Sequence, residues 1–74
     1  MPNTSQIFEF SLYNEEVRSL FKMGERHARF DESWADQRYI QVRAENEELA
    51  AKEVRRRYPE AKGFVYTSVV RFME

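Results

Sequence analysis

The sequence contains no cysteine, and only two of its 74 residues are glycine and two are proline. Without cysteine, neither a disulfide nor a thiolate metal site can form. A glycine-rich phosphate loop is excluded as well, because Gly24 and Gly63 stand alone. Few glycines and prolines, together with 15% aromatic residues, argue against disorder and favour a compact fold.

Long apolar runs and a surplus of one charge are also missing. No stretch approaches the roughly 18 apolar residues of a membrane-spanning helix. The polar start MPNTSQ leads into no signal-peptide core, so we expect a cytoplasmic protein with no membrane partner. Twelve basic residues stand against 13 acidic ones, with an isoelectric point near 5.9. DNA-binding domains usually have a clear basic surplus, so a general attraction to nucleic acid is not expected.

The sequence offers little for catalysis. Nucleophilic catalysis needs a nucleophile, a base and a group that orients the base. His27 is the only histidine, and no serine or threonine stands in a recognisable motif. Glu45, Glu47 and Glu48 lack the spacing of a calcium loop, and their place at a helix start is explained by the helix dipole. We therefore expect no enzyme, no catalytic residue, no metal and no cofactor.

Alternating apolar residues predict three strands, at 7–12, 38–44 and 64–72. The last two are separated by a helix with an Ala50, Ala51, Val54 and Tyr58 core stripe. The domain prediction is a flexible segment 1–5 followed by a single α+β domain over 6–74. The expected architecture is a three-stranded sheet with two helices packed on one face, in β-α-β-α-β order. The strand order is open, but the preference for right-handed crossovers predicts at least one parallel pair.

Asparagines are expected to cap both helices, because their side chains accept hydrogen bonds from the first helical turn. Asn14 opens the first helix, which runs towards Trp34 either unbroken or with a break near Asp31, where Asp31 would cap a short second piece. Asn46 opens the second helix, and Pro59 stops it.

The first predicted helix carries two apolar lines. One is an ordinary core face: Val17, Leu20, Phe21, Gly24 and Ala28. The other lies about 120° round the helix: Met23, His27, Phe30 and Trp34. This second line either packs inside the fold or serves as an aromatic anchor for another protein, since tryptophan, tyrosine and arginine dominate interface hot spots.

A partner surface built on the second line would have a basic rim and one further apolar residue. Leu49 points away from the core stripe of its helix, and beside Trp34 it would extend the patch. The candidate partner-binding residues are therefore Met23, Arg26, His27, Arg29, Phe30, Trp34, Arg38 and Leu49.

Nucleic-acid binding is the alternative function. A basic line follows the first predicted helix: Arg18, Lys22, Arg26 and Arg29. The outer sheet face would add Tyr39, with Tyr66 from the last strand, because aromatic sheets can stack single-stranded bases. The triplet Arg55 to Arg57 is explained by its place at a helix C-terminus. Two further alternatives are a peptide added to the first or last strand, and an accessory domain whose apolar lines are all internal.

A likeness to a known family covers nearly the whole chain and is carried chiefly by one segment: FSLYNEEVRSLFKMGERHARFDESWADQRYIQVRAENEELAAKEVRRRYP. With the length and composition of the chain, this segment resembles the small phage-encoded transcription regulators that bind host RNA polymerase, of the kind found in a lytic Xanthomonas phage. The resemblance implies a protein of the host bacterial cytoplasm that binds the N-terminal part of the largest polymerase subunit. It implies inhibition of initiation and readthrough of terminators, with nucleic acid contacted only indirectly. It assigns no residue a role. We expect this protein to be a monomer.

Overall fold

A computed structural model describes residues 5–72 of the chain. Most of the expected flexible segment 1–5 therefore lies outside the described residues. Along the chain the elements are β1 (Gln6–Asn14), α1 (Glu15–Lys22), the 3-10 turn η1 (Glu32–Ala35), β2 (Arg38–Ala44), α2 (Glu47–Arg57), the 3-10 turn η2 (Glu60–Lys62) and β3 (Phe64–Phe72). The α+β class and the β-α-β-α-β order are confirmed.

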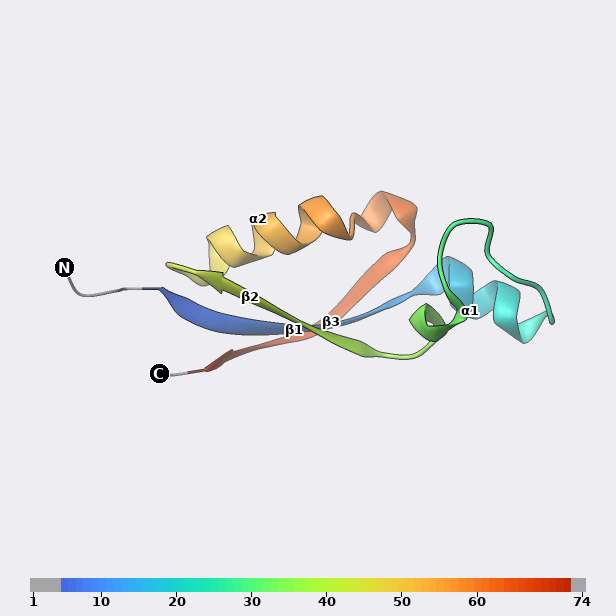
Figure 1. Cartoon of the computed structure of the whole chain (residues 1–74), viewed down its shortest axis with the longest axis horizontal. Coiled ribbons are helices and arrows are strands. Elements are labelled where there is room, and N and C mark those ends of the chain that lie inside the picture. Colours follow the sequence, from blue (N-terminus) through green and yellow to red (C-terminus); the bar gives the residue numbers. More distant parts are fainter. Residues whose placement is uncertain (1–4, 73–74) are drawn as a thin grey trace.

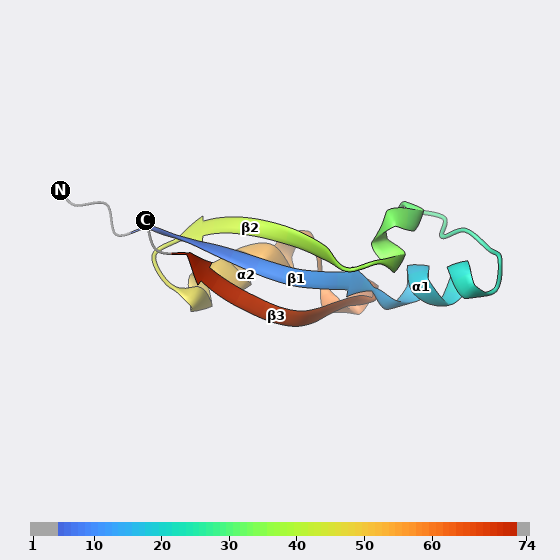
Figure 2. The same cartoon turned by 90° about the horizontal axis from the view of Figure 1, so that it is seen from below.

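The three strands form one sheet in the order β2-β1-β3, and both neighbouring pairs are antiparallel. The expected parallel pair is thus wrong for the described sheet. Since β2 and β3 both run opposite to β1, they run parallel to each other, and α2 connects them. This crossover passes over β1, so the two parallel strands are not neighbours. Figure 2 shows β1 between β2 and β3.

The core lies between the sheet and α2. Alternate residues of β1 point into it as predicted, and Phe8, Phe10 and Leu12 are all buried. From α2 the alanine Ala50 and the valine Val54 meet them, both with no exposed surface. α2 runs along one face of the sheet, and in residues 5–72 no helix covers the other (Figure 1).

The structure differs from the expectation in where α1 lies, because α1 continues beyond the end of the sheet (Figure 1). Asn14 is both the last residue of β1 and the N-cap of α1, so no loop lets the helix fold back. The molecule is therefore elongated, 52 × 18 × 15 Å, with a radius of gyration of 14.2 Å. A compact chain of this length would have a radius of about 11 Å.

The first helix ends at Lys22, so the prediction of one helix towards Trp34 is wrong in its unbroken form. Gly24 adopts a positive φ of 76°, and the amide of Glu25 donates to the carbonyl of Leu20 at 2.8 Å. With the amide of Gly24 on the carbonyl of Phe21, this is a Schellman C-cap. The break lies at Lys22 and not near Asp31, but the predicted capping role of Asp31 is confirmed, since its carboxylate accepts from the amide of Ser33 at the start of η1.

Candidate protein-docking surface

The residues after β1 and before β2 form a distal lobe, defined here as residues 15–37. It contains α1, the connecting segment 23–31 and η1, and it lies at one end of the molecule (Figure 1). Six of the eight candidate partner-binding residues lie in it. The expected line of Met23, His27, Phe30 and Trp34 does not exist as a helix face, because all four lie beyond the end of α1.

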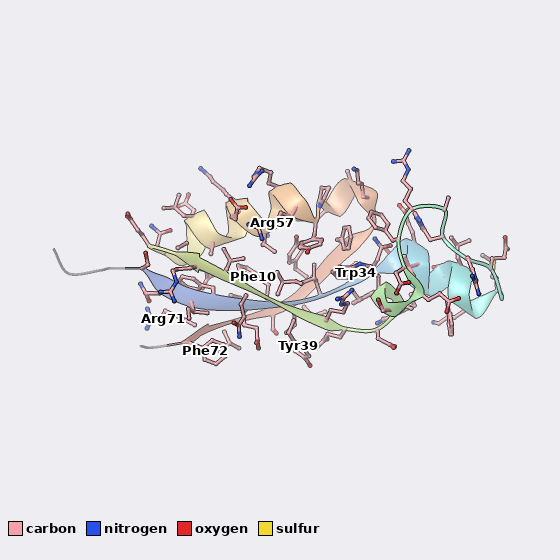
Figure 3. The ribbon with its side chains drawn as sticks, viewed as in Figure 1. Phe10, Trp34, Tyr39, Arg57, Arg71 and Phe72 are labelled. Atoms are coloured by element: carbon pink, nitrogen blue, oxygen red, sulfur yellow. The ribbon has the colours of Figure 1, made fainter. Side chains whose placement is uncertain are left out.

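Trp34 and Phe30 join the distal lobe to the main core. The Trp34 indole is 8% exposed and packs edge-on against Phe64, with ring centroids 5.0 Å apart. Phe30 reaches the same Phe64 ring at 5.1 Å. Figure 3 shows Trp34 beneath the end of α2. The alternative of internal packing therefore describes Trp34, and its indole cannot serve as a free anchor in this structure.

His27 organises the segment between α1 and η1. Its Nδ1 accepts hydrogen bonds from the amides of Arg29 and Phe30, at 3.0 and 3.2 Å. Because Nδ1 is an acceptor, Nε2 carries the proton and donates to the Glu16 carboxylate at 3.0 Å. The ring thus ties segment 23–31 back to α1, and its side chain is only 12% exposed. These contacts give His27 a structural role.

Two of the four residues of the expected basic line, Arg18 and Arg26, are engaged in contacts inside the molecule. Arg18 stacks on Tyr13 at 3.5 Å and donates to the carbonyl of Ala35 at 2.8 Å. Arg26 pairs with Glu32 at 3.2 Å. Among residues 5–72, the side chains of Lys22 and Arg29 have no hydrogen bond or ion pair to another described residue. These two cations remain available to a partner.

Arg38, the expected rim residue, also makes contacts inside the molecule. Its guanidinium lies 4.4 Å from the centre of the Trp34 ring and donates to the Ser33 hydroxyl at 3.3 Å. It covers the indole from the solvent side, which explains part of the burial of Trp34.

Two large apolar side chains at the end of α1 are exposed. Phe21 is 56% exposed and Met23 is 63% exposed. The sequence placed Phe21 on the core face, which is wrong because α1 lies past the sheet and buries only Val17. Phe21 borders an open groove of about 670 Å³ between α1 and η1. The other residues that line it are Arg18, Lys22, Glu32, Ser33, Ala35 and Asp36.

Leu49 is exposed as expected, at 44%, but it does not extend this surface. It borders a separate hollow near the end of β2, with Ala44 and Lys52. Trp34 packs instead on Tyr58. Tyr58 follows Leu49 by nine residues, which places it about 13 Å from Leu49 along the helix axis. The expected joint patch of Leu49 and Trp34 is therefore wrong.

The two tyrosines expected on the outer sheet face lie on opposite faces. Tyr39 is 60% exposed and points away from α2 (Figure 3). Tyr66 pairs with the core residue Leu12, because a bulge beside Thr67 reverses the alternation of β3. Its hydroxyl donates to the carbonyl of Tyr58 at 2.5 Å, and burial raises the pKa of Tyr66 to about 12. The placement of Tyr66 on the outer face is wrong.

Comparisons with known proteins assign this chain to no family, and the described residues contain neither a metal site nor a membrane-spanning helix. No family model, curated protein or solved structure matches the chain. Within residues 5–72, no three histidine, aspartate or glutamate side chains are grouped so as to hold a metal ion. No helix in that part of the chain is long and apolar enough to cross a membrane.

Proposed function

We propose that the protein is a non-enzymatic binding module whose distal lobe docks on bacterial RNA polymerase and modulates host transcription. We infer the docking surface from the exposure of Phe21 and Met23. Beside them lies Lys22, whose side chain has no hydrogen bond or ion pair within residues 5–72. Burying a large apolar side chain such as Phe21 gains about 1.5–3 kcal/mol, which a small domain leaves unused when both Phe21 and Met23 remain in solvent. The choice of polymerase as the partner rests on the family resemblance.

The chemistry of the lobe describes the surface it fits. A partner needs an apolar hollow for Phe21 and Met23 and carboxylates near enough to meet Lys22 and Arg29. The arginines that hold the lobe together limit its rearrangement, so the side chains are presented on a fixed frame. Preorganisation of this kind lowers the ordering cost of binding. As in the resemblance, the expected consequences are inhibition of initiation and readthrough of terminators.

The nucleic-acid alternative lacks a comparable observation. Arg18 and Arg26 are engaged within the lobe, and Tyr39 and Tyr66 lie on opposite faces of the sheet. The accessory-domain alternative would account for Trp34 and Phe30 but leaves Phe21 and Met23 unexplained.

Direct binding to purified bacterial RNA polymerase tests the proposal. We expect the double variant Phe21→Ser and Met23→Ser to weaken binding at least tenfold, about 1.4 kcal/mol. Leu49→Ser is the matched control, because it removes an exposed apolar side chain at the other end of the molecule and should leave the affinity unchanged. An unmutated protein that fails to bind overturns the polymerase assignment. Equal affinities for the double variant and the unmutated protein overturn the docking surface.

A further inference from the structure

β3 is an edge strand with little protection against pairing. It is nine residues long, and Arg71 is its only charged residue. Exposed edges in native proteins usually carry lysines, prolines or short strands that block a further strand. The opposite edge, β2, is two residues shorter and carries Arg38 and Arg43. The β3 edge is therefore the one open to strand addition.

The bulge in β3 limits which part of this edge can pair in register. From Ser68 to Phe72 the alternation is regular. Val69 and Arg71 pair with the core residues Phe10 and Phe8, so they share the face that α2 covers. On the open face the corresponding residues are Ser68, Val70 and Phe72, which pair with Ser11, Glu9 and Ile7. Before Ser68 the even-numbered residues of β3 point to the α2 face instead of the open face. A regular added strand can therefore pair in register with only one of the two halves of β3.

We propose that two copies of this chain associate through the segment 68–72 of β3, paired antiparallel about Val70, to form a continuous six-stranded sheet. An antiparallel pair of identical strands has twofold symmetry, as most homodimers do. In this register Val70 meets its counterpart, Phe72 meets Ser68 of the second copy, and Arg71 meets Val69. This register places α2 of both copies on the same face of the sheet, whereas a register shifted by one residue would place α2 of the second copy on the opposite face and break the twofold symmetry. This proposed dimer differs from the monomer expected from the sequence.

Charge complementarity favours a second copy as the occupant. Val69 borders a groove of about 230 Å³ between α2 and β3, and Glu47 at the start of α2 lines the same groove. Arg71 of the second copy, opposite Val69, would point towards this Glu47. Neither Glu47 nor Arg71 forms an ion pair within residues 5–72 of one copy, whereas Arg55 in the groove already pairs with Glu60. The twofold axis creates the Glu47–Arg71 contact twice.

Exposure and shape agree with the same occupant. Val70 is 49% exposed and Phe72 42%, and Phe72 points away from α2 on the uncovered face (Figure 3). In the dimer these side chains form a continuous apolar strip across the centre of the sheet. The elongated monomer leaves this edge accessible to a second copy.

The mass of the full chain in solution, measured over a range of concentrations, tests the dimer. We expect a concentration-dependent rise to twice the 9.0 kDa mass of one chain. Val70→Lys places like charges opposite each other and should raise the dimer dissociation constant at least tenfold. Tyr39→Lys, an exposed position on the other edge strand, is the control and should leave it unchanged. A chain that stays monomeric up to millimolar concentration overturns the proposal.

A charge swap and two cysteine variants test the register through restored association and cross-linking. Glu47→Arg and Arg71→Glu should each weaken the dimer, and the double variant should restore it. Because the chain has no cysteine, Val70→Cys should form a cross-linked dimer on oxidation. Ser68→Cys should not, since the two sulfurs would be about 14 Å apart along the strands. Cross-linking through Ser68→Cys alone, or no rescue by the double swap, overturns the Val70-centred pairing. No polymerase is present, so the outcome is independent of the proposed function.

Discussion

The indole of Trp34 and the phenol ring of Tyr58 pack with their centroids 5.1 Å apart, joining η1 to the C-cap of α2. Phe64 at the start of β3 contacts both rings, at 5.0 and 5.3 Å. These three aromatic residues come from three separate elements and hold the distal lobe on the end of the sheet. These ring contacts fix the position of the lobe that carries the exposed Phe21.

Truncating Trp34 should remove a large part of the free energy of unfolding. We expect Trp34→Ala to lower the free energy of unfolding by about 3–5 kcal/mol, since it removes a buried indole and leaves a cavity. Urea denaturation followed by circular dichroism measures the change. Met23→Ala, at an exposed position of the same lobe, should change it by less than about 0.5 kcal/mol. Similar losses for the two variants would contradict the burial of Trp34.

Asn14 joins β1, α1 and the turn before β3 through both ends of its amide. Its Oδ1 accepts from the amide of Val17 and its Nδ2 donates to the carbonyl of Lys62, each at 3.0 Å. Asn14→Asp keeps the acceptor but loses the buried donor, so we expect a loss of about 1–3 kcal/mol in unfolding experiments. Asn46→Asp is the matched control, because Asn46 is an exposed cap and aspartate caps equally well. Equal effects at the two caps would show that the Lys62 contact contributes nothing.

The two glycines should differ in their tolerance of a methyl group. Both have a positive φ, 76° at Gly24 and 99° at Gly63, so alanine costs about 1–2 kcal/mol at either. At Gly63 the added Cβ would also lie 2.8 Å from the Glu16 Cγ and 2.9 Å from the Asn14 Oδ1, whereas nothing lies within 4 Å of it at Gly24. We expect Gly63→Ala to cost about 1–3 kcal/mol more than Gly24→Ala in thermal or urea unfolding. The reverse order would contradict the close packing of this turn.

The raised pKa of Tyr66 predicts that the protein loses stability in alkaline solution. Burial raises the pKa of Tyr66 from 10.0 to about 12, so the folded state favours the protonated hydroxyl. This contribution is complete below pH 10 and is lost as the pH rises from 10 towards 12. We expect Tyr66→Phe to cost about 0.5–1.5 kcal/mol at neutral pH, through the lost bond to Tyr58, and to flatten the decline above pH 10. Stability profiles of the two proteins that remain parallel above pH 10 would contradict the assignment.

Local signals in the sequence predicted the elements well. Both asparagine caps, the Asp31 cap of η1, the core residues of β1 and the last strand follow from periodicity and capping chemistry, which act over a few residues. Gly24 also carried a signal: as a left-handed C-cap it ends α1, although it was counted in an apolar line. Ending the helix there removes the line on which the Trp34 anchor depended.

The errors concern relationships that no short segment encodes. The parallel strands β2 and β3 are not neighbours because β1 lies between them, and this strand order is decided by packing across the whole sheet. Tyr66 faces the core because of one bulge, and a single inserted residue reverses every later side chain. The exposure of Phe21 follows from α1 leaving the sheet without a loop. The candidate surface is therefore centred on Phe21 and not on Trp34, and Met23 remains a candidate at the C-cap of α1.

Hydrogen–deuterium exchange of the chain with and without purified bacterial RNA polymerase is the decisive test of docking through the distal lobe, because it locates the docking surface without substitutions. We expect the polymerase to slow exchange in the end of α1 and the segment after it, residues 19–31, and to leave α2 unchanged. Slower exchange confined to α2 or the sheet, or no change in the presence of saturating polymerase, would contradict it.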